Sequence, residues 1–145
     1  MVLDTNVVLD WLVFDDPSVH PLRDRISDGR ISIVTHDLAM AELRRVLSYR
    51  HFALAAPRQA AVLEQYLAQA ARVPDDEHAR VVHMDVPPGF PRCRDPDDNL
   101  FLALAYHAKA AALVSKDKRV LKCRRRARPF GFDILKVAQV IAAFE

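Results

Sequence analysis

Short apolar runs alternate along this chain with longer segments in which apolar residues recur every three or four positions. The runs cover residues 1–3, 31–34, 111–114 and 130–132, and residues 81–84 form a further candidate. Each run is short enough to be a strand, whereas the recurrence in the longer segments is typical of helices. Strands that alternate with helices form a parallel sheet with helices on both faces. The sequence therefore predicts an α/β fold.

The helices are expected to begin at residues that favour helix starts. Thr5 or Asn6 can cap the first helix, Pro17 can open the second, and Pro96 suits the first turn of the helix after Asp95. The expected helices cover about residues 7–12, 17–28, 38–47, 57–71, 96–109 and 137–141. The third expected helix has apolar positions Leu38, Ala41, Val46 and Leu47. The fourth is expected to bury Val62, Leu63, Tyr66 and Leu67.

Length and composition fit one compact domain over residues 1–145. The chain has 145 residues, of which 51% are hydrophobic, and a net charge of +2, so it can bury a sizeable core. No apolar stretch reaches the roughly 20 residues that a membrane span needs. Asp4 stands where a signal peptide would carry basic residues, and Cys93 and Cys123 lack the spacing of a zinc site or a disulfide framework. These features predict a protein of the reducing cytoplasm.

The basic residues are concentrated in one segment near the end of the chain. Residues 116–128 hold eight basic residues and one acid, Asp117, which gives this segment a charge of +7. Such a run is a candidate for binding phosphates. A solvated loop or helix end is the alternative interpretation of a charge run of this kind.

Four acids are expected to meet at one edge of the predicted sheet. Asp4 directly follows the first apolar run, and Asp117 follows the run that ends at Val114. The carboxyl ends of parallel strands lie together, and ligand sites form there in open α/β sheets. Asp98 lies in the first turn of the helix before that run, and Glu42 borders the buried stripe of the third expected helix.

A cluster of carboxylates of this kind repels itself strongly unless a cation lies among them. All-oxygen ligation suits Mg²⁺ or Mn²⁺ rather than zinc, which prefers His and Cys. One or two such ions can activate water and neutralise the charge that develops on a phosphodiester. Together with a candidate phosphate-binding segment nearby, this cluster predicts a nuclease.

Each acid also has a simpler interpretation. Asp4 can cap the first helix, Asp98 can be a favourable charge at a helix N-terminus, Glu42 can be a surface acid, and Asp117 can belong to a turn. A phosphatase with Asp4 as covalent nucleophile is a different enzyme class, but Asn6 stands where its D-x-D-x-T motif needs a second Asp. A non-catalytic module that binds RNA or a partner is a further alternative. A glycine-rich nucleotide-binding loop is excluded, since the chain has only three Gly.

Four motifs occur in an order that resembles a known family. They are Leu3-Asp4-Thr5-Asn6, Glu42-Leu43 in a helix, Asp95-Pro96-Asp97-Asp98-Asn99, and Val114-Ser115-Lys116-Asp117. Together they span residues 2 to about 121 and resemble the PIN domain, and within it the toxin components of prokaryotic toxin–antitoxin pairs. The first motif alone would recur by chance, whereas four motifs in the same order make the resemblance specific.

The resemblance implies a three-layer α/β/α sandwich with a central parallel sheet and a Mg²⁺- or Mn²⁺-dependent ribonuclease activity. By resemblance, the catalytic acids are Asp4, Glu42, Asp98 and Asp117, and three of these acids are expected to hold the metal directly, namely Asp4, Asp98 and Asp117. Asp98 is preferred to Asp97 because the helix acid of the family is followed five positions later by Ala, here Ala103.

Polar neighbours, substrate contacts and partners follow from the same interpretation. The side chains expected to orient the carboxylates and water are Thr5, Asn6, Asn99 and Ser115. Single-stranded RNA is the expected substrate, and the side chains expected to hold its phosphates are Lys116, Arg119, Arg124, Arg125 and Arg126. A small antitoxin protein and a second copy of the chain are the other expected partners.

Overall fold

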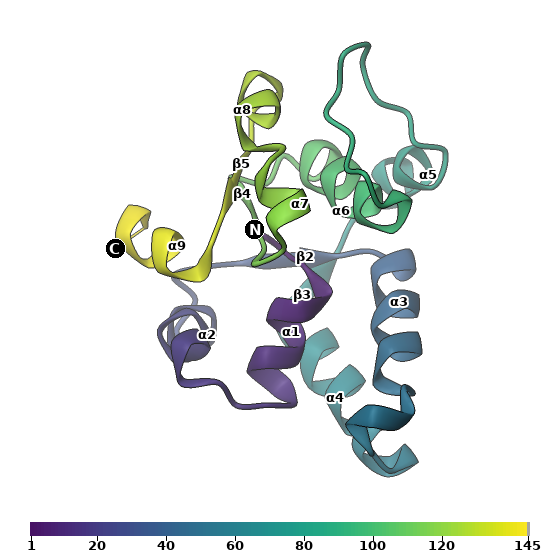
Figure 1. The fold of residues 1–145 in the computed structure, drawn as a ribbon, viewed down its shortest axis with the longest axis vertical. Helices are drawn as coiled ribbons and strands as arrows, with labels where there is room; N and C mark the ends of the chain where they lie inside the picture. The colour runs from purple at the N-terminus through teal and green to yellow at the C-terminus, as the bar shows by residue number, and fades with distance from the viewer. Residues whose placement is uncertain (145) are drawn as a thin grey trace.

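Short parallel strands form the centre of the molecule (Figure 1). The computed structural model describes residues 1–144. One sheet has the order β1-β4-β5, and a second sheet pairs β2 with β3, with every pairing parallel. The strands are β1 (Val2–Leu3), β2 (Ile33–Thr35), β3 (Ala70–Arg72), β4 (Ala112–Val114) and β5 (Asp133–Leu135).

The two sheets adjoin each other along β1 and β2. The backbone N–H of Val34 donates to the carbonyl of Met1 at 2.9 Å, and the amino group of Met1 donates to the carbonyl of Ser32 at 2.6 Å. The strands therefore follow one another in the order β3-β2-β1-β4-β5. In this order the direction of winding reverses between β1 and β4, and open α/β sheets bind their ligands at the carboxyl ends of the strands at such a point.

Helices cover both faces of the sheet, as the α/β/α prediction requires (Figure 1). Alternate strand residues belong to two separate cores: Leu3, Val114 and Leu135 lie in one, and their neighbours Val2, Leu113 and Ile134 lie in the other. The first core includes residues of α1 (Thr5–Leu12), α2 (His20–Ser27), α4 (Ala56–Gln69) and α9 (Val137–Ala143). The second includes residues of α5 (Asp75–Val82), α6 (Pro96–His107), α7 (Lys118–Leu121) and α8 (Arg124–Ala127).

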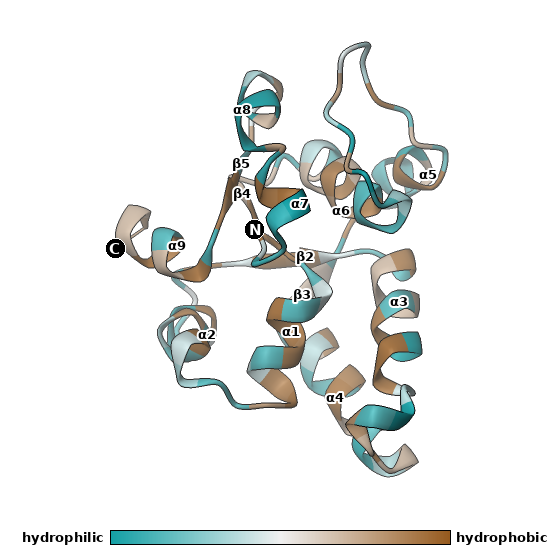
Figure 2. Cartoon of the chain, in the orientation of Figure 1, coloured by the Kyte–Doolittle hydropathy of each residue, from teal (hydrophilic) through white to brown (hydrophobic). Residues whose placement is uncertain are grey.

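One long helix and three short 3₁₀ turns complete the fold. Helix α3 (Asp37–Leu47) lies beside the sheet and contributes Ala39 to one core and Leu43 to the other. Figure 2 shows the apolar residues on β4 and on the inner sides of the helices, with polar residues on the outer sides. The 3₁₀ turns are η1 (Pro17–Val19), η2 (Arg50–Phe52) and η3 (Arg128–Phe130). None of the helices over residues 1–144 combines the length and the apolar character that a membrane crossing requires.

Several predicted boundaries are shifted in the structure. Asp4, rather than Thr5 or Asn6, is the N-cap residue of α1, so both of the residues expected to cap the helix lie inside it. The predicted strand at 31–34 forms at Ile33–Thr35, and the one at 130–132 forms at Asp133–Leu135. The second shift arises because η3 ends at Gly131, whose left-handed φ of 94° breaks any extended run there.

Two secondary-structure predictions are wrong. The apolar run at 81–84, predicted as a strand, lies at the end of helix α5. Pro74 is the N-cap residue of this helix, and its first turn holds three acids. An apolar run this short does not by itself distinguish a strand from the end of a helix. The helix predicted at 57–71 ends at Gln69, and Ala70–Arg72 pairs with β2 instead.

One predicted buried position is wrong, since Leu67 of α4 is 52% exposed. The buried residues of α3 are Ala39, Met40, Leu43 and Leu47, and its apolar Leu38 is 43% exposed. Of the positions predicted for α4, Val62 and Tyr66 are buried.

Candidate active site

Asp4 and Asp117 follow the two strands that flank the reversal of the sheet. Asp4 comes directly after β1 and is buried, and Asp117 is the N-cap residue of α7 after β4. The hydroxyl of Ser115 donates to Asp4 Oδ2 at 2.6 Å, and the same Ser115 Oγ accepts from the backbone N–H of Asp117 at 3.0 Å. Ser115 therefore joins the two acids. Burial raises the pKa of Asp4, while the Ser115 hydrogen bond partly offsets this shift.

Glu42 reaches the same edge from α3. The hydroxyl of Thr5, the residue after Asp4, donates to Glu42 Oε2. Burial raises the pKa of Glu42, the Thr5 hydrogen bond lowers it, and the charge of Asp4 raises it further. Thr5 thus holds Glu42 against the start of α1, as the prediction of an orienting role for this side chain requires.

Asp98 enters the cluster from the first turn of α6. That turn is capped by Asp95, whose side chain accepts from the backbone N–H of Asp97 at 3.0 Å. Asp98 Oδ2 is buried and has no hydrogen-bond partner in the structure. Burial, together with the charges of Asp4 and Asp117, raises the pKa of Asp98 to about 7. A buried carboxylate oxygen without a donor is unfavourable unless something else neutralises it.

Asp97 occupies a different position from Asp98 although the two are adjacent in sequence. Its side chain is 66% exposed, and its carboxylate is 3.8 Å from Arg45 of α3. Asp97 therefore lies at the rim of the site, whereas Asp98 faces inward among the other acids. The structure favours the choice of Asp98 as the inner acid of this turn.

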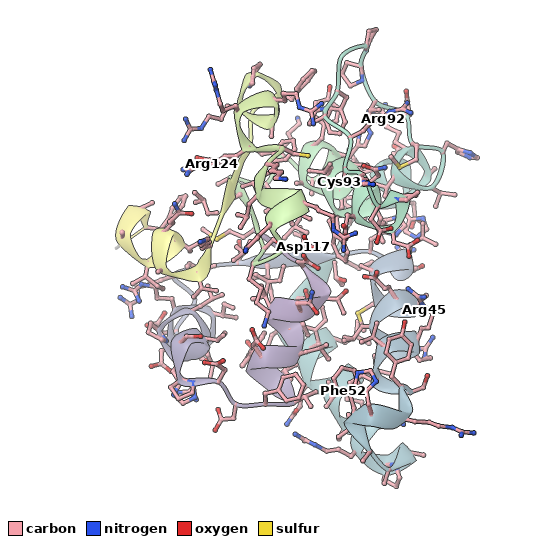
Figure 3. The ribbon with its side chains drawn as sticks, viewed as in Figure 1. Arg45, Phe52, Arg92, Cys93, Asp117 and Arg124 are labelled. Atoms are coloured by element: carbon pink, nitrogen blue, oxygen red, sulfur yellow. The ribbon has the colours of Figure 1, made fainter. Side chains whose placement is uncertain are left out.

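The four acids border one open pocket of about 390 Å³. It lies at the carboxyl end of β1 and β4, where Figure 3 shows Asp117 at the base of α7 beside the start of α1. Its other polar lining residues include Arg45 of α3 and Arg119 of α7. The full lining is Asp4, Thr5, Asn6, Glu42, Arg45, Val46, Tyr49, His51, Phe52, Asp95, Asp97, Asp98, Asp117 and Arg119.

This donor set fits a hard divalent cation. The inner acids offer only carboxylate oxygens, which Mg²⁺ and Mn²⁺ prefer, and Asp98 Oδ2 is a buried oxygen in need of a positive partner. Within residues 1–144, no three His, Cys, Asp or Glu side chains stand close enough together to hold a metal ion as they are placed.

Not all of the predicted polar neighbours face the acids. Asn6 lines the pocket. Asn99 is instead engaged elsewhere, because its Oδ1 accepts from the backbone N–H of Cys93 at 2.7 Å. Asn99 therefore ties the loop before α6 to α6 itself. In that loop the free thiol of Cys93 lies 3.6 Å from that of Cys123, which follows α7.

The predicted phosphate-binding residues separate into different groups. Arg119 lines the pocket, whereas the ammonium of Lys116 is 2.6 Å from the carboxylate of Asp10. Arg124 donates to Asp133 at 2.7 Å and lies well away from Asp117 in Figure 3. Arg125 and Arg126 belong to the same short helix α8 as Arg124 and are absent from the pocket lining. The basic run is therefore not one continuous patch at the acids.

Sequence reasoning missed several residues of the pocket, namely Arg45, Tyr49, His51 and Phe52. A signal was present for Arg45, which lies three residues after Glu42 on the same face of α3, whereas Tyr49 lies beyond the end of this helix. His51 and Phe52 carry no such signal, because they lie in the 3₁₀ turn η2 after the helix has ended.

Comparison with known families agrees with this geometry. The sequence model of the PIN domain matches residues 1–119, a range that contains all four acids. No curated protein and no solved structure is significantly similar to the chain. PIN domains are in general nucleases, hydrolases that act on nucleic acids and typically use divalent metals. The match covers most of the chain, and the protein therefore belongs to the PIN domain family.

Proposed function

We propose that this protein is a Mg²⁺- or Mn²⁺-dependent endoribonuclease that hydrolyses phosphodiester bonds of single-stranded RNA. The observation that carries the proposal is the convergence of Asp4, Glu42, Asp98 and Asp117 on one pocket, with Asp98 Oδ2 buried and unpartnered. Four acids from four segments are far more than helix capping needs. The repulsion between these carboxylates is relieved when a cation lies among them. A cation bound in an open pocket attracts an anionic substrate such as a phosphodiester.

Asp4, Asp98 and Asp117 would hold the metal, with Glu42 completing the cluster. When bound, a divalent ion supplies charge neutralisation at the phosphodiester and lowers the pKa of water. Ser115 fixes the orientation of Asp4 through its hydroxyl, and Thr5 does the same for Glu42. Such supporting hydrogen bonds keep the carboxylates in place while the substrate binds.

Arg119 and Arg45 supply positive charge at the rim of the pocket. A guanidinium is suited to phosphate groups because it presents several N–H donors in a fixed plane. Both side chains are more than half exposed, at 54% and 55%, and their ion pairs with Asp117 and Glu42 are long, at 3.7 Å and 3.8 Å. They can therefore turn to the phosphates on either side of the bond that is cut.

The first test is cleavage of a single-stranded RNA oligonucleotide by the wild type with Mn²⁺, with EDTA, and by Asp4→Asn with Mn²⁺. We expect cleavage only by the wild type with Mn²⁺, since Asp4 is the most buried of the acids and its charge is required in the pocket. Circular dichroism checks that the variant is folded. Equal activity of the two proteins would refute the proposal, and RNA binding without any cleavage would favour the non-catalytic module instead.

Substitution of Arg119 by Ala is expected to weaken RNA binding several-fold and to lower the slope of log affinity against log salt by about one. The matched control is Arg124→Ala, which removes a guanidinium from the same basic run. Because Arg124 is occupied by Asp133, we expect this second variant to change RNA affinity little. Fluorescence anisotropy over a salt series measures both. A larger loss for Arg124→Ala than for Arg119→Ala would place the substrate over α8 instead.

The role as a toxin component is part of the proposal and is supported by the resemblance of the four motifs. On this interpretation a small antitoxin binds the protein and blocks access of RNA to the acids. Growth arrest on expression of the wild type, but not of Asp4→Asn, is the expected cellular result.

A further inference from the structure

Three aromatic side chains stand together beside the acids. Tyr49, His51 and Phe52, called here the aromatic cluster, all line the same pocket as Asp4 and Asp98. The rings of Tyr49 and Phe52 are nearly parallel, with an interplanar angle of 7° and centroids 6.3 Å apart. The His51 ring lies 4.3 Å from the Phe52 ring and 5.8 Å from the Tyr49 ring.

The fold holds this cluster at a fixed place. Phe52 is half-buried against the core and contacts Phe14 at a centroid distance of 5.7 Å. The turn is closed by the backbone N–H of Phe52, which donates to the carbonyl of Tyr49 at 3.1 Å. It ends at Ala53, whose φ of 51° lies in the left-handed region that a non-glycine residue rarely adopts. A short, closed turn of this kind keeps the backbone of the three residues at one place beside the acids.

Burial does not explain Tyr49 and His51. Tyr49 is 38% exposed and His51 is exposed, although Phe52 beside them reaches the core. The remaining pocket is strongly charged, so these rings face a space lined by carboxylates and by Arg45 rather than an apolar partner. Figure 3 shows Phe52 at the end of α3 that is farther from the sheet, and Arg45 along the same helix towards Asp117.

We infer that the aromatic cluster is a stacking site for an unpaired nucleobase adjacent to the phosphate held at the acids. The inference rests on the proposed function, because it takes the pocket to bind a phosphodiester. A nucleotide carries its phosphate and its base on one sugar, so a phosphate near the carboxylates brings a base to the neighbouring part of the same pocket. Stacking on aromatic rings accepts any base, since every base has a π face.

This site explains a preference for single strands in physical terms. A base in a duplex is already stacked and paired, so it reaches Tyr49 only if it is first pulled out at an energetic cost. An unpaired base in a single strand needs no such extrusion. The acids and the arginines would accept the backbone of either form, and the aromatic cluster would select the single strand.

The test uses single-stranded RNA that carries 2-aminopurine, a base whose fluorescence falls when it stacks on an aromatic ring. Binding is measured in the Asp4→Asn background, so that the RNA stays intact. We expect Tyr49→Ala to weaken affinity roughly 5- to 100-fold and to abolish the quenching, whereas Tyr49→Phe keeps both. Phe144→Ala is the matched control, because Phe144 is exposed to a similar degree, at 39%, and lines a different pocket. We expect it to change nothing.

A duplex of the same sequence provides the second arm. It is expected to bind more weakly than the single strand and to be insensitive to Tyr49→Ala. Equal affinity and quenching for Tyr49→Ala and Tyr49→Phe would overturn the stacking site, as would a failure of Tyr49→Phe to bind the single strand. If the wild type fails to cut RNA but quenching still depends on Tyr49, the nuclease proposal falls and the stacking site stands.

Discussion

The Asp98→Asn variant is expected to lose RNA cleavage by roughly three orders of magnitude while remaining folded. Asn preserves the size of the side chain but removes its charge, and Asp98 is the acid whose buried Oδ2 has no donor in the structure. The negative charges of Asp4 and Asp117 repel the Asp98 carboxylate, and a bound cation would relieve this repulsion. Initial rates of oligonucleotide cleavage with saturating Mn²⁺ measure the loss.

Asp97→Asn is the matched control for this experiment. It makes the same chemical change one position earlier in the same turn of α6, at a side chain that is 66% exposed and 3.8 Å from Arg45. We expect it to retain cleavage within a few-fold of the wild type. If Asp97→Asn were the inactive variant and Asp98→Asn the active one, the inner and outer acids would be wrongly assigned.

The second large effect concerns the free energy of unfolding. Without metal, the wild type is expected to become less stable than the Asp98→Asn variant as pH rises from 5 to 8. The pKa of Asp98 is raised from 3.8 in the unfolded chain to about 7 in the folded protein. A group with a raised pKa in the folded state stabilises the fold below its unfolded pKa and loses that contribution as pH rises through the folded value. Burial also raises the pKa of Asp4 and of Glu42, so these groups act in the same direction.

The comparison with Asp98→Asn isolates this effect from other titrations. Burial lowers the pKa of His36, so the contribution of His36 to the stability of the fold increases as pH rises through its titration range. This effect is opposite in sign to that of the acids. Asp37 and Asp133 have lowered pKa values, and their contributions are lost only at lower pH, near and below about 4. His36, Asp37 and Asp133 are common to both proteins, and their effects therefore cancel in the difference.

Thermal unfolding in EDTA at pH 5 and at pH 8 measures the difference. We expect similar Tm values at pH 5 and a Tm for Asp98→Asn higher by a few degrees at pH 8. Addition of Mn²⁺ should raise the Tm of the wild type at pH 8 and leave that of Asp98→Asn nearly unchanged. A wild type that is the more stable of the two at pH 8 without metal would show that the acids do not repel one another.

Much of the fold could be predicted from the alternation of short apolar runs with helical segments. The strands at β1 and β4 are short and wholly apolar, and each is followed by an acid, which placed Asp4 and Asp117 at one edge. One of the failures is strand β3, which depends on pairing rather than on residue type. β3 consists of Ala70–Arg72, and Ala favours helices, so only its pairing with β2 makes this segment a strand.

The sequence predicts that four acids meet, and the structure places all four around one pocket, whereas most of the surroundings of that pocket could not be predicted. Motif order identified the acids because each stands at a fixed place relative to a strand end or a helix start. Arg124 belongs to the basic run, but its ion pair with Asp133 depends on how α8 packs against β5. Tyr49 and Phe52 reach the pocket because a 3₁₀ turn brings the chain back beside the acids. No residue pattern in the sequence predicts that turn.

Titration calorimetry with Mn²⁺ at pH 8 is the most direct test of the claim that the carboxylates form a metal centre. The wild type is expected to bind the ion, Asp97→Asn to bind it with nearly the same affinity, and Asp98→Asn to bind it at least roughly tenfold more weakly. Absence of Mn²⁺ binding by the wild type, or equal affinity for Asp98→Asn, would contradict the claim.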